Sequence, residues 1–111
     1  MMRTIRSNRE IDEVFRTGAR VSHPLVIALT RQTPAGRGPE GRVAFVAGKK
    51  LGNAVKRNRS KRVMRAAMDR AGGPWPGTDV VLIARPSTAT APPSQLDDAV
   101  AAVSRAVGAG R

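Results

Sequence analysis

A run of cations without acids occupies the middle of the sequence. No Asp or Glu lies between Glu40 and Asp69, and within this interval eight Lys or Arg side chains crowd into a helix-forming segment. They are Lys49, Lys50, Lys56, Arg57, Arg59, Lys61, Arg62 and Arg65. The first turns of such a helix are basic nearly all round, so the helix cannot simply be half buried. Its positive field is not neutralised from within the segment and attracts polyanions, which predicts a nucleic-acid partner.

The alternative for any charge run is a solvated surface helix. A merely solvated helix normally mixes its signs and forms ion pairs at a spacing of four residues, which this segment cannot do. The loop from Gly48 to Asn53 adds two lysines just ahead of the helix, where free N–H groups and the helix dipole favour an anion. The loop lacks the spacing of a phosphate-binding loop, so the sequence does not indicate a nucleoside triphosphatase.

A helical wheel divides the basic helix into two sides. The outward side carries Arg57, Lys61 and Arg65, flanked by Asn58 and Arg62. The inward side carries Val63, Ala66 and Ala67. Arg59 falls on the inward side and is expected to point toward the sheet, where its planar fork could grip one phosphate or base edge bidentately.

Composition sets the remaining bounds. The 111 residues predict a single domain, 1–111, and 20 Lys and Arg against eight Asp and Glu give a formal charge of +12. There is no cysteine and only one histidine, His23, so neither a disulfide nor a metal centre of the protein itself is expected. No apolar run approaches the roughly 20 residues that span a bilayer, and we expect no membrane association and a cytoplasmic protein.

Helix signals flank the basic segment on both sides. Ser7 and Glu10 have capping-box spacing and Gly18 supplies a stop, which predicts a helix over 8–17. Asn53 is a good cap for the basic helix, which must end before the Gly/Pro-rich residues 72–77. A last helix, capped by Ser94, carries a core-facing stripe. The stripe consists of Leu96, Ala99, Val100, Val103 and Val107.

Apolar runs between the helices read as strands. They cover 20–22, 25–30, 42–47 and 79–84. Because the runs are continuously apolar, the sheet faces should be largely covered by helices. The sequence therefore predicts an α+β fold in which helices pack on a small mixed sheet.

Candidates for catalysis by the protein are poor. Glu10, Asp12 and Glu13 lie on the first helix, where acids are ordinary complements of the helix dipole. His23 stands beside a proline at a strand edge, and a structural role or solvent exposure is expected. Trp75 could stack on a base, but a loop residue that caps the core is the expected role. No catalytic residue is predicted.

A long motif resembles a known family. The residues Lys49-Lys50-x-Gly52-Asn53-Ala54-Val55-x-Arg57-Asn58-Arg59-x-Lys61-Arg62-x-x-Arg65 closely resemble the Arg-Asn-Arg signature of the protein subunit of bacterial ribonuclease P. The segment from Phe15 to Gly18 and the strand at 79–84 with Arg85 are also similar to that family, so the resemblance extends over most of the chain.

The resemblance implies a fold and a function. The fold would be a four-stranded mixed sheet with three helices in the order αβββαβα, with a left-handed βαβ crossover, although generic connections are right-handed in about 98% of cases. The RNA subunit of that family is the catalyst and, with bound Mg²⁺, cuts the 5′ leader from precursor tRNA. The protein is an auxiliary subunit that binds the catalytic RNA and the leader, and Mg²⁺ would be held mainly by the RNA.

Site residues are carried over by position. Contacts to the catalytic RNA would come from Lys49, Lys50, Arg57, Asn58, Arg59, Lys61, Arg62 and Arg65. The leader cleft would be lined by Ile11, Phe15 and Leu29. Ile11 and Leu29 stand where aromatic residues are common in the family, so base stacking in this cleft is expected to be reduced. Other departures are Ala47-Gly48 before the lysines and Ser60 inside the signature.

Two rival functions use the same features. A structural RNA-binding protein of ribosomal type, with no part in catalysis, would be served equally well by a basic helix on an α+β domain. A DNA-compacting protein is less favoured, because the chain has neither a dimerisation stripe nor a long basic arm, and we expect a monomer when the protein is free. Reconstitution of precursor-tRNA cleavage distinguishes the first hypothesis from both.

Overall fold

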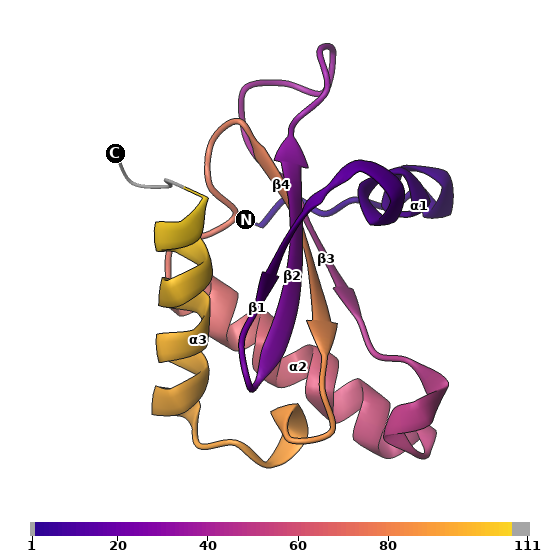
Figure 1. Ribbon diagram of the computed structural model, residues 1–111, viewed down its shortest axis with the longest axis vertical. Helices are drawn as coiled ribbons and strands as arrows, with labels where there is room; N and C mark the ends of the chain where they lie inside the picture. Colours follow the sequence, from indigo (N-terminus) through magenta and orange to yellow (C-terminus); the bar gives the residue numbers. More distant parts are fainter. Residues whose placement is uncertain (1, 108–111) are drawn as a thin grey trace.

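The main helices and strands follow one another in the predicted order αβββαβα between residues 2 and 107, the part of the chain that this computed structural model describes (Figure 1). They are α1 (Asn8–Thr17), β1 (Ala19–Ser22), β2 (Val26–Gln32), β3 (Val43–Val46), α2 (Ala54–Arg70), β4 (Thr78–Ala84) and α3 (Pro93–Ala106). Two short 3₁₀ helices, η1 (Lys49–Leu51) and η2 (Thr88–Thr90), precede α2 and α3. None of the helices within 2–107 is long and apolar enough to cross a membrane.

Side-chain caps fix the starts of the first two helices. The Glu10 amide donates to Oγ of Ser7 at 3.4 Å, and the Lys56 amide donates to Oδ1 of Asn53 at 2.9 Å, as the sequence predicts. The third helix begins at Pro93, with Pro92 in the cap position, so the prediction that Ser94 caps it is wrong. Proline fits the first turn because its missing N–H would have no helical partner there.

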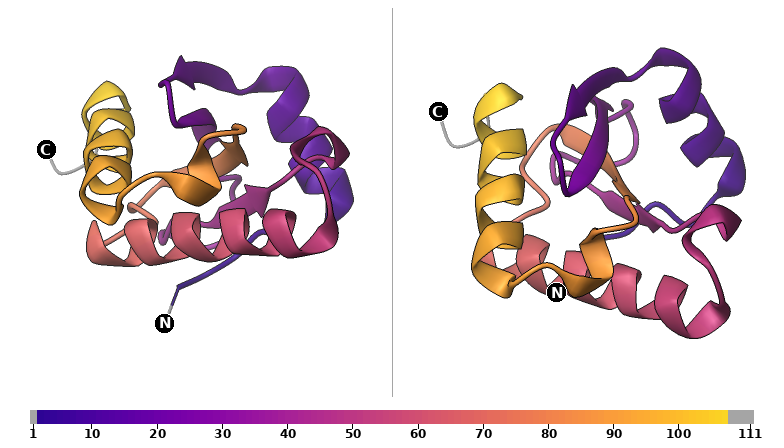
Figure 2. Two further views of the ribbon diagram at one scale, coloured as in Figure 1. Left: turned by 90° about the horizontal axis from the view of Figure 1, so that it is seen from below. Right: turned by 60° about the horizontal axis from the view of Figure 1, so that its bottom comes forward.

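The four strands form one mixed sheet in the order β1-β2-β4-β3. All neighbours are antiparallel except β3 and β4, which are parallel and connected through α2. In Figure 1 both of these strands run downward with β3 to the right of β4, and Figure 2 places α2 behind them. The crossover is therefore left-handed, as the resemblance implied and against the usual preference.

One face of the sheet is fully covered. Helices α2 and α3 pack on it and enclose the main core. The largest side chains there that are at most 1% exposed are Met64, Met68, Leu82, Leu96, Val26, Val43, Val80, Val100 and Val103. Trp75 is 7% exposed and packs into this core, which confirms its expected role as a loop cap. Val107 of the predicted stripe is only partly buried.

The opposite face is covered only in part. Val14 of α1 is completely buried against Leu29 and Val81 of the sheet, with Ile5 and Ala44 beside them. Three neighbouring side chains, Ile11, Val46 and Ile83, remain partly exposed. The expectation that helices cover both faces thus holds for one face only. The uncovered apolar strip becomes important for the site below.

A buried ion-pair network seats α1 on this second face. Nη2 of Arg42 is 2.7 Å from Oδ2 of Asp79 and 2.7 Å from Oε2 of Glu10. The Asp79 side chain has no exposed surface and that of Arg42 is 6% exposed. Arg31, directly opposite Asp79 in the β2–β4 register, adds contacts at 3.5 Å to Asp79 and 3.2 Å to Glu13. The network thereby joins α1 to β2, to β4 and to the residue just before β3.

The network changes the interpretation of the α1 acids. Glu10 and Glu13 are not merely dipole complements, because both form ion pairs with arginines of the sheet. The hydrogen bond from Arg42, reinforced by the charges of Arg42, Arg37 and Arg31, lowers the pKa of Glu10 below its ordinary value, although desolvation acts in the opposite direction. The hydrogen bond to Asp79 likewise raises the pKa of Arg42.

We predict that Asp79→Asn lowers the free energy of unfolding by about 3–5 kcal/mol, because it leaves the buried Arg42 without its main counter-charge. The matched control is Asp97→Asn, which removes an exposed pair with Arg70 at 2.8 Å and should cost at most about 1 kcal/mol. Urea unfolding of both variants measures the difference. Equal losses would show that the network does not hold the fold together.

A second prediction concerns pH. Because the folded-state pKa of Glu10 is lowered, its contribution to stability is present above its ordinary pKa of 4.5 and is lost as pH falls through the folded value. Glu10→Gln should therefore destabilise the protein at about pH 6 and much less at about pH 3. Urea unfolding at both pH values tests this. A constant difference between the two proteins would contradict it.

Candidate nucleic-acid interface

The side of α2 that packs on the core carries no cation of the basic run. Its buried residues are Ser60, Met64, Ala67 and Met68. The expectation that Ala66 faces inward is wrong, because Ala66 is exposed. The side of the helix that packs on the core is instead centred on Met64. The buried Ser60 donates to the carbonyl oxygen of Lys56 at 3.0 Å, which explains why a polar residue is tolerated at this position of the motif.

Charges of opposite sign are segregated over the molecule. Five of the eight acids form ion pairs within the described residues: Glu10, Glu13, Glu40, Asp79 and Asp97. Their partners all lie outside the basic run. Within residues 2–107, no Lys or Arg from Lys49 to Arg65 has a carboxylate within ion-pair distance. The positive field of this surface is therefore not cancelled locally.

The cations leave α2 in several directions. Lys61 and Arg65 lie on the flank next to the edge of β3, where the guanidinium of Arg65 is 5.0 Å from the centre of the Phe45 ring. They do not form the purely outward stripe that the sequence predicts. Asn58 and Arg62 are exposed, and Arg57 is half-buried.

Arg59 lies on the other flank of α2. Its Nε donates to the carbonyl oxygen of Ala89 in η2 at 3.1 Å, so the side chain is held in place, but by η2 and not by the sheet. The wheel correctly groups Arg59 with Val63. It could not show that η2, which follows far later in the sequence, covers that side.

The loop before α2 presents two more cations. Lys49 and Lys50 are exposed on η1, and Leu51 anchors the loop because it is 7% exposed and belongs to the main core. Gly52 has φ 113°, a conformation that side chains rarely adopt, and it turns the chain into the helix. The lysines are thereby fixed just ahead of the positive end of the α2 dipole.

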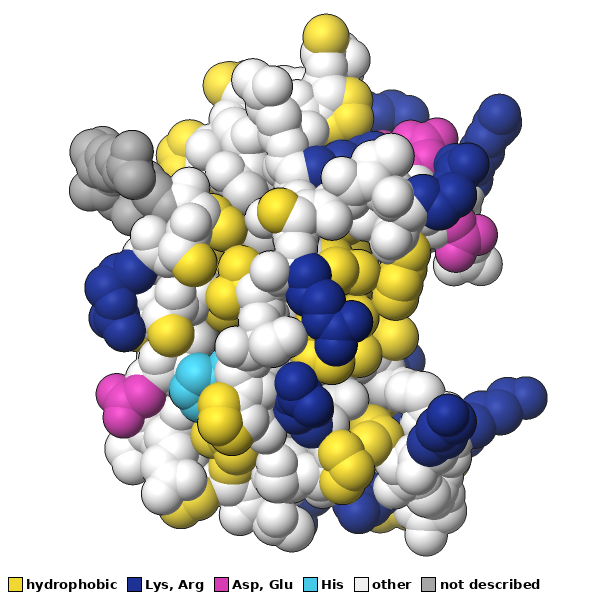
Figure 3. All heavy atoms as spheres, in the orientation of Figure 1, with side chains coloured by type: hydrophobic (Ala, Val, Ile, Leu, Met, Phe, Trp, Pro, Cys, Tyr) yellow, Lys and Arg dark blue, Asp and Glu magenta, His cyan; other side chains and the backbone are white. Residues whose placement is uncertain are grey.

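An apolar cleft lies beside these cations. Figure 3 shows hydrophobic side chains gathered over the exposed part of the sheet, in a hollow between α1 and the η1 end of α2, with Lys and Arg side chains around it. Phe15 on α1 is 46% exposed, and the spacing of four residues places it on the same side of the helix as Ile11. Ile11, Val46 and Ile83 are partly exposed on the same side of the sheet.

The predicted leader-cleft residues have different places in this hollow. Phe15 and Ile11 stand on α1 with accessible surface, whereas Leu29 is 7% exposed and packs beneath Val14. Leu29 can form only the floor. His23, by contrast, has a structural role, because its Nδ1 accepts a hydrogen bond from the Leu25 amide at 3.1 Å.

Two residues near the cleft escaped the sequence analysis as individual contacts. Arg85 follows β4, and the two-residue period of a strand places it on the same side of the sheet as Val81 and Ile83. Its Nε is buried without a hydrogen-bond partner among the described residues, so the hydrogen-bonding capacity of this side chain is not used up within the protein. The side of the sheet on which Arg85 lies could therefore have been predicted from the sequence. The position of Phe45 beside Arg65 could not, because it depends on how α2 packs against the sheet edge.

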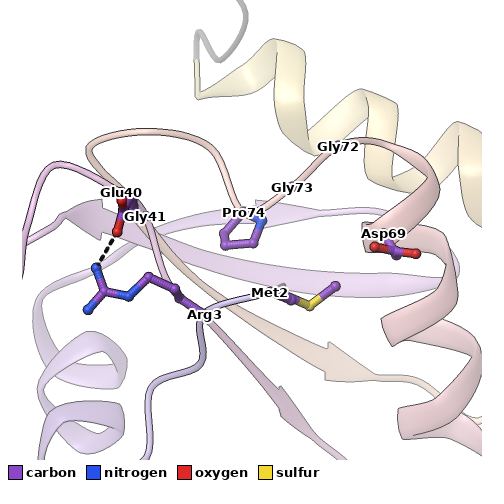
Figure 4. A pocket seen from close by; sticks show the side chains of 8 residues that line it. All are labelled: Met2, Arg3, Glu40, Gly41, Asp69, Gly72, Gly73 and Pro74. Atoms are coloured by element: carbon purple, nitrogen blue, oxygen red, sulfur yellow. Dashed lines mark hydrogen bonds and ion pairs between the residues drawn. The ribbon is translucent and has the colours of Figure 1, made fainter.

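Another hollow has the opposite electrostatic character. A cavity of about 490 Å³ is lined by two acids, Glu40 and Asp69, together with residues of the N-terminal segment and of the loop 72–74 (Figure 4). Arg3 is 2.8 Å from Glu40 and neutralises it, while Asp69 lies on the far side. Phosphate binding is therefore favoured on the η1 and α2 surface and not here.

Comparison with known proteins identifies the family. The family model described as Ribonuclease P matches residues 2–107. A ribonuclease P protein component from Beutenbergia cavernae is 38% identical over 94 residues, covering 84% of this chain and 77% of that protein. One from Streptomyces avermitilis is 34% identical over 114 residues, covering 96% and 93%. One from Brevibacillus brevis is 37% identical over 87 residues, and the match spans 74% of this chain but only 64% of that protein.

Solved structures show the same fold. An RNase P protein from Staphylococcus aureus superimposes with a TM-score of 0.81, 22% identity and full coverage of both chains. One from Thermotoga maritima has a TM-score of 0.76 at 22% identity, covering 90% of this chain and 93% of that one. The match to the family model over almost the whole chain, together with the basic helix and its motif, shows that this protein belongs to the ribonuclease P protein family.

Proposed function

We propose that this chain is the auxiliary protein subunit of a ribonuclease P, which binds the catalytic RNA and the 5′ leader of precursor tRNA during removal of that leader. The observation that carries the proposal is a group of eight cations, none with a carboxylate partner among residues 2–107, beside a partly uncovered apolar cleft. The cations suit a folded RNA, because phosphate contacts supply affinity without requiring a particular sequence. The cleft suits unpaired bases, which stack on exposed apolar and aromatic side chains.

The two surfaces have separate tasks in this proposal. Lys49, Lys50 and the exposed cations of α2 bind phosphates of the catalytic RNA. Phe15, supported by Ile11 and floored by Leu29, receives bases of the leader, and Arg85 is available to a leader phosphate. Because α1 is fixed to the sheet by Glu10, the leader is held in a fixed position relative to the RNA.

Catalysis is assigned to the RNA and not to a protein side chain. The carboxylates that lie together, on α1 and β4, are paired with arginines, and no group of three or more His, Asp or Glu that could hold a metal occurs within residues 2–107. These residues do not fit a Mg²⁺ centre. We therefore propose that Mg²⁺ is held mainly by the RNA, while the protein lowers the local density of negative charge.

A structural RNA-binding protein of ribosomal type is the rival function. It would use the same basic helix, but it has no need for an accessible aromatic in an apolar cleft, and Phe15 favours the first proposal. The cytoplasm as the place of action and a monomeric free state stay predictions.

Reconstitution tests the proposed function. The purified protein, added to its catalytic RNA and precursor tRNA, should raise the rate of leader removal most at low Mg²⁺, where phosphate neutralisation by protein matters most. A variant with Lys49, Lys50 and Lys61 replaced by Gln should lose most of this gain, whereas Arg105→Gln on α3 should keep it. Absence of any effect of the unmodified protein would refute the proposal.

The leader cleft generates a separate prediction. Phe15→Ala should weaken binding of precursor tRNA by roughly 10-fold, since stacking on one aromatic contributes about 1–3 kcal/mol per base, and should leave binding of leaderless tRNA unchanged. The control is Val55→Ala, which also truncates an exposed apolar side chain, 74% exposed, but on α2. Both are measured with the reconstituted holoenzyme. A similar loss for the two RNAs would show that Phe15 does not contact the leader.

A further inference from the structure

The edge of β3 that faces away from β4 has hydrogen-bond partners along only part of its length. The segment before α1 pairs with it at one residue, where the Ile5 amide donates to the carbonyl oxygen of Val43 at 2.9 Å and the Val43 amide donates to that of Arg3 at 3.1 Å. The chain then turns away to begin α1. By the two-residue period of a strand, the N–H and C=O of Phe45 point the same way as those of Val43, away from β4. They are left facing an open space.

That space is a cavity of about 270 Å³. Ile5, Ile11 and Ala44 contribute apolar wall, Phe45 lies along the strand edge, and Lys61 and Arg65 enter from α2. Its walls contain no carboxylate, whereas the hollows described above beside Glu40 and Asp69, and those beside Glu10 and Asp97, each have at least one. The combination of apolar walls, two cations and free backbone groups suits a single nucleotide.

Arg65 supplies a platform in this cavity. The carbon at the centre of its guanidinium lies over the Phe45 ring, 5.0 Å from the ring centre, so the aromatic occupies one side of this cation. The residue is otherwise exposed and has no carboxylate partner among the described residues. The second side of the plane is open to a ligand. A guanidinium plane in this state stacks on an unpaired RNA base.

We propose that this cavity is a binding site for one unpaired nucleotide of the catalytic RNA. Its base stacks on the open side of Arg65, its polar edge meets the free N–H and C=O of Phe45, and its phosphate lies near Lys61. The assignment rests on the proposed function and adds a base-recognising pocket to a surface otherwise described only by phosphate contacts. An added peptide strand is the other occupant of a free edge, but two cations and no acid favour RNA.

Chemical probing of the catalytic RNA, without substrate, tests the site. Base-specific modification with dimethyl sulfate and carbodiimide should show at least one unpaired base that the unmodified protein protects. Arg65→Lys keeps the charge but loses the plane, and it should restore the reactivity of that base at least 5-fold. Arg105→Lys, an exposed position on α3 and outside the RNA-binding surface, should leave the protection unchanged. Phe45→Leu keeps an apolar side chain, removes the ring behind Arg65, and should restore reactivity in part.

The outcomes separate the two proposals. Backbone protection from hydroxyl radicals elsewhere on the RNA should persist in every variant, and the melting temperature of Arg65→Lys should match that of the unmodified protein because the side chain is exposed. Identical base reactivity with Arg65→Lys and the unmodified protein would overturn this inference alone and would leave the edge to a protein strand. When the probing is repeated with precursor tRNA added, Arg65-dependent protection found only on its leader would also overturn it. Failure of the unmodified protein to bind the RNA would overturn the proposed function as well.

Discussion

The buried guanidinium of Arg42 between Asp79 and Glu10 is the interaction on which the rest of the structure depends. A chain with a charge of +12 has few acids, and it places three of them, Glu10, Glu13 and Asp79, where α1 meets the sheet. Arg31 and Arg42 balance them there, so the interior attraction is strong, while the charged groups of α2 from Lys56 to Arg65 are all cations. The ion pairs that stabilise the fold and the unpaired cations that attract RNA thus lie in different parts of the molecule. The acids of the first group do not neutralise the cations of the second.

The left-handed crossover has a geometric result for the site. It brings the start of α2 and the η1 lysines to the mouth of the apolar cleft, on the side opposite α1. The end of α2, which carries Asp69 and Arg70, lies instead near α3 and the acidic cavity. The direction of a single helix therefore separates the surface into a cationic side, at the start of α2, and a side with acids, at its end.

Local signals in the sequence predicted local structure well. The bounds of α1 follow from Ser7 and Gly18, and the start of α2 from Asn53, because caps act within a few residues. The direction of Arg59 could not be predicted, since η2 must first pack against α2. The pairing of Glu10 with Arg42 and of Phe45 with Arg65 likewise joins residues distant in sequence. The candidate cations were identifiable from composition, whereas their grouping into separate binding surfaces required the packed sheet.

The partly covered face of the sheet has a consequence for how variants of this protein will behave. An additional helix packed over Ile11, Val46 and Ile83 would bury more apolar surface and stabilise the fold, yet it would close the cleft. Under the proposed function, substitutions there face opposing demands, because a side chain that improves the isolated protein would remove a surface that the leader needs. The sheet is then incomplete as a protein structure, and a bound single strand would supply the layer that the chain omits.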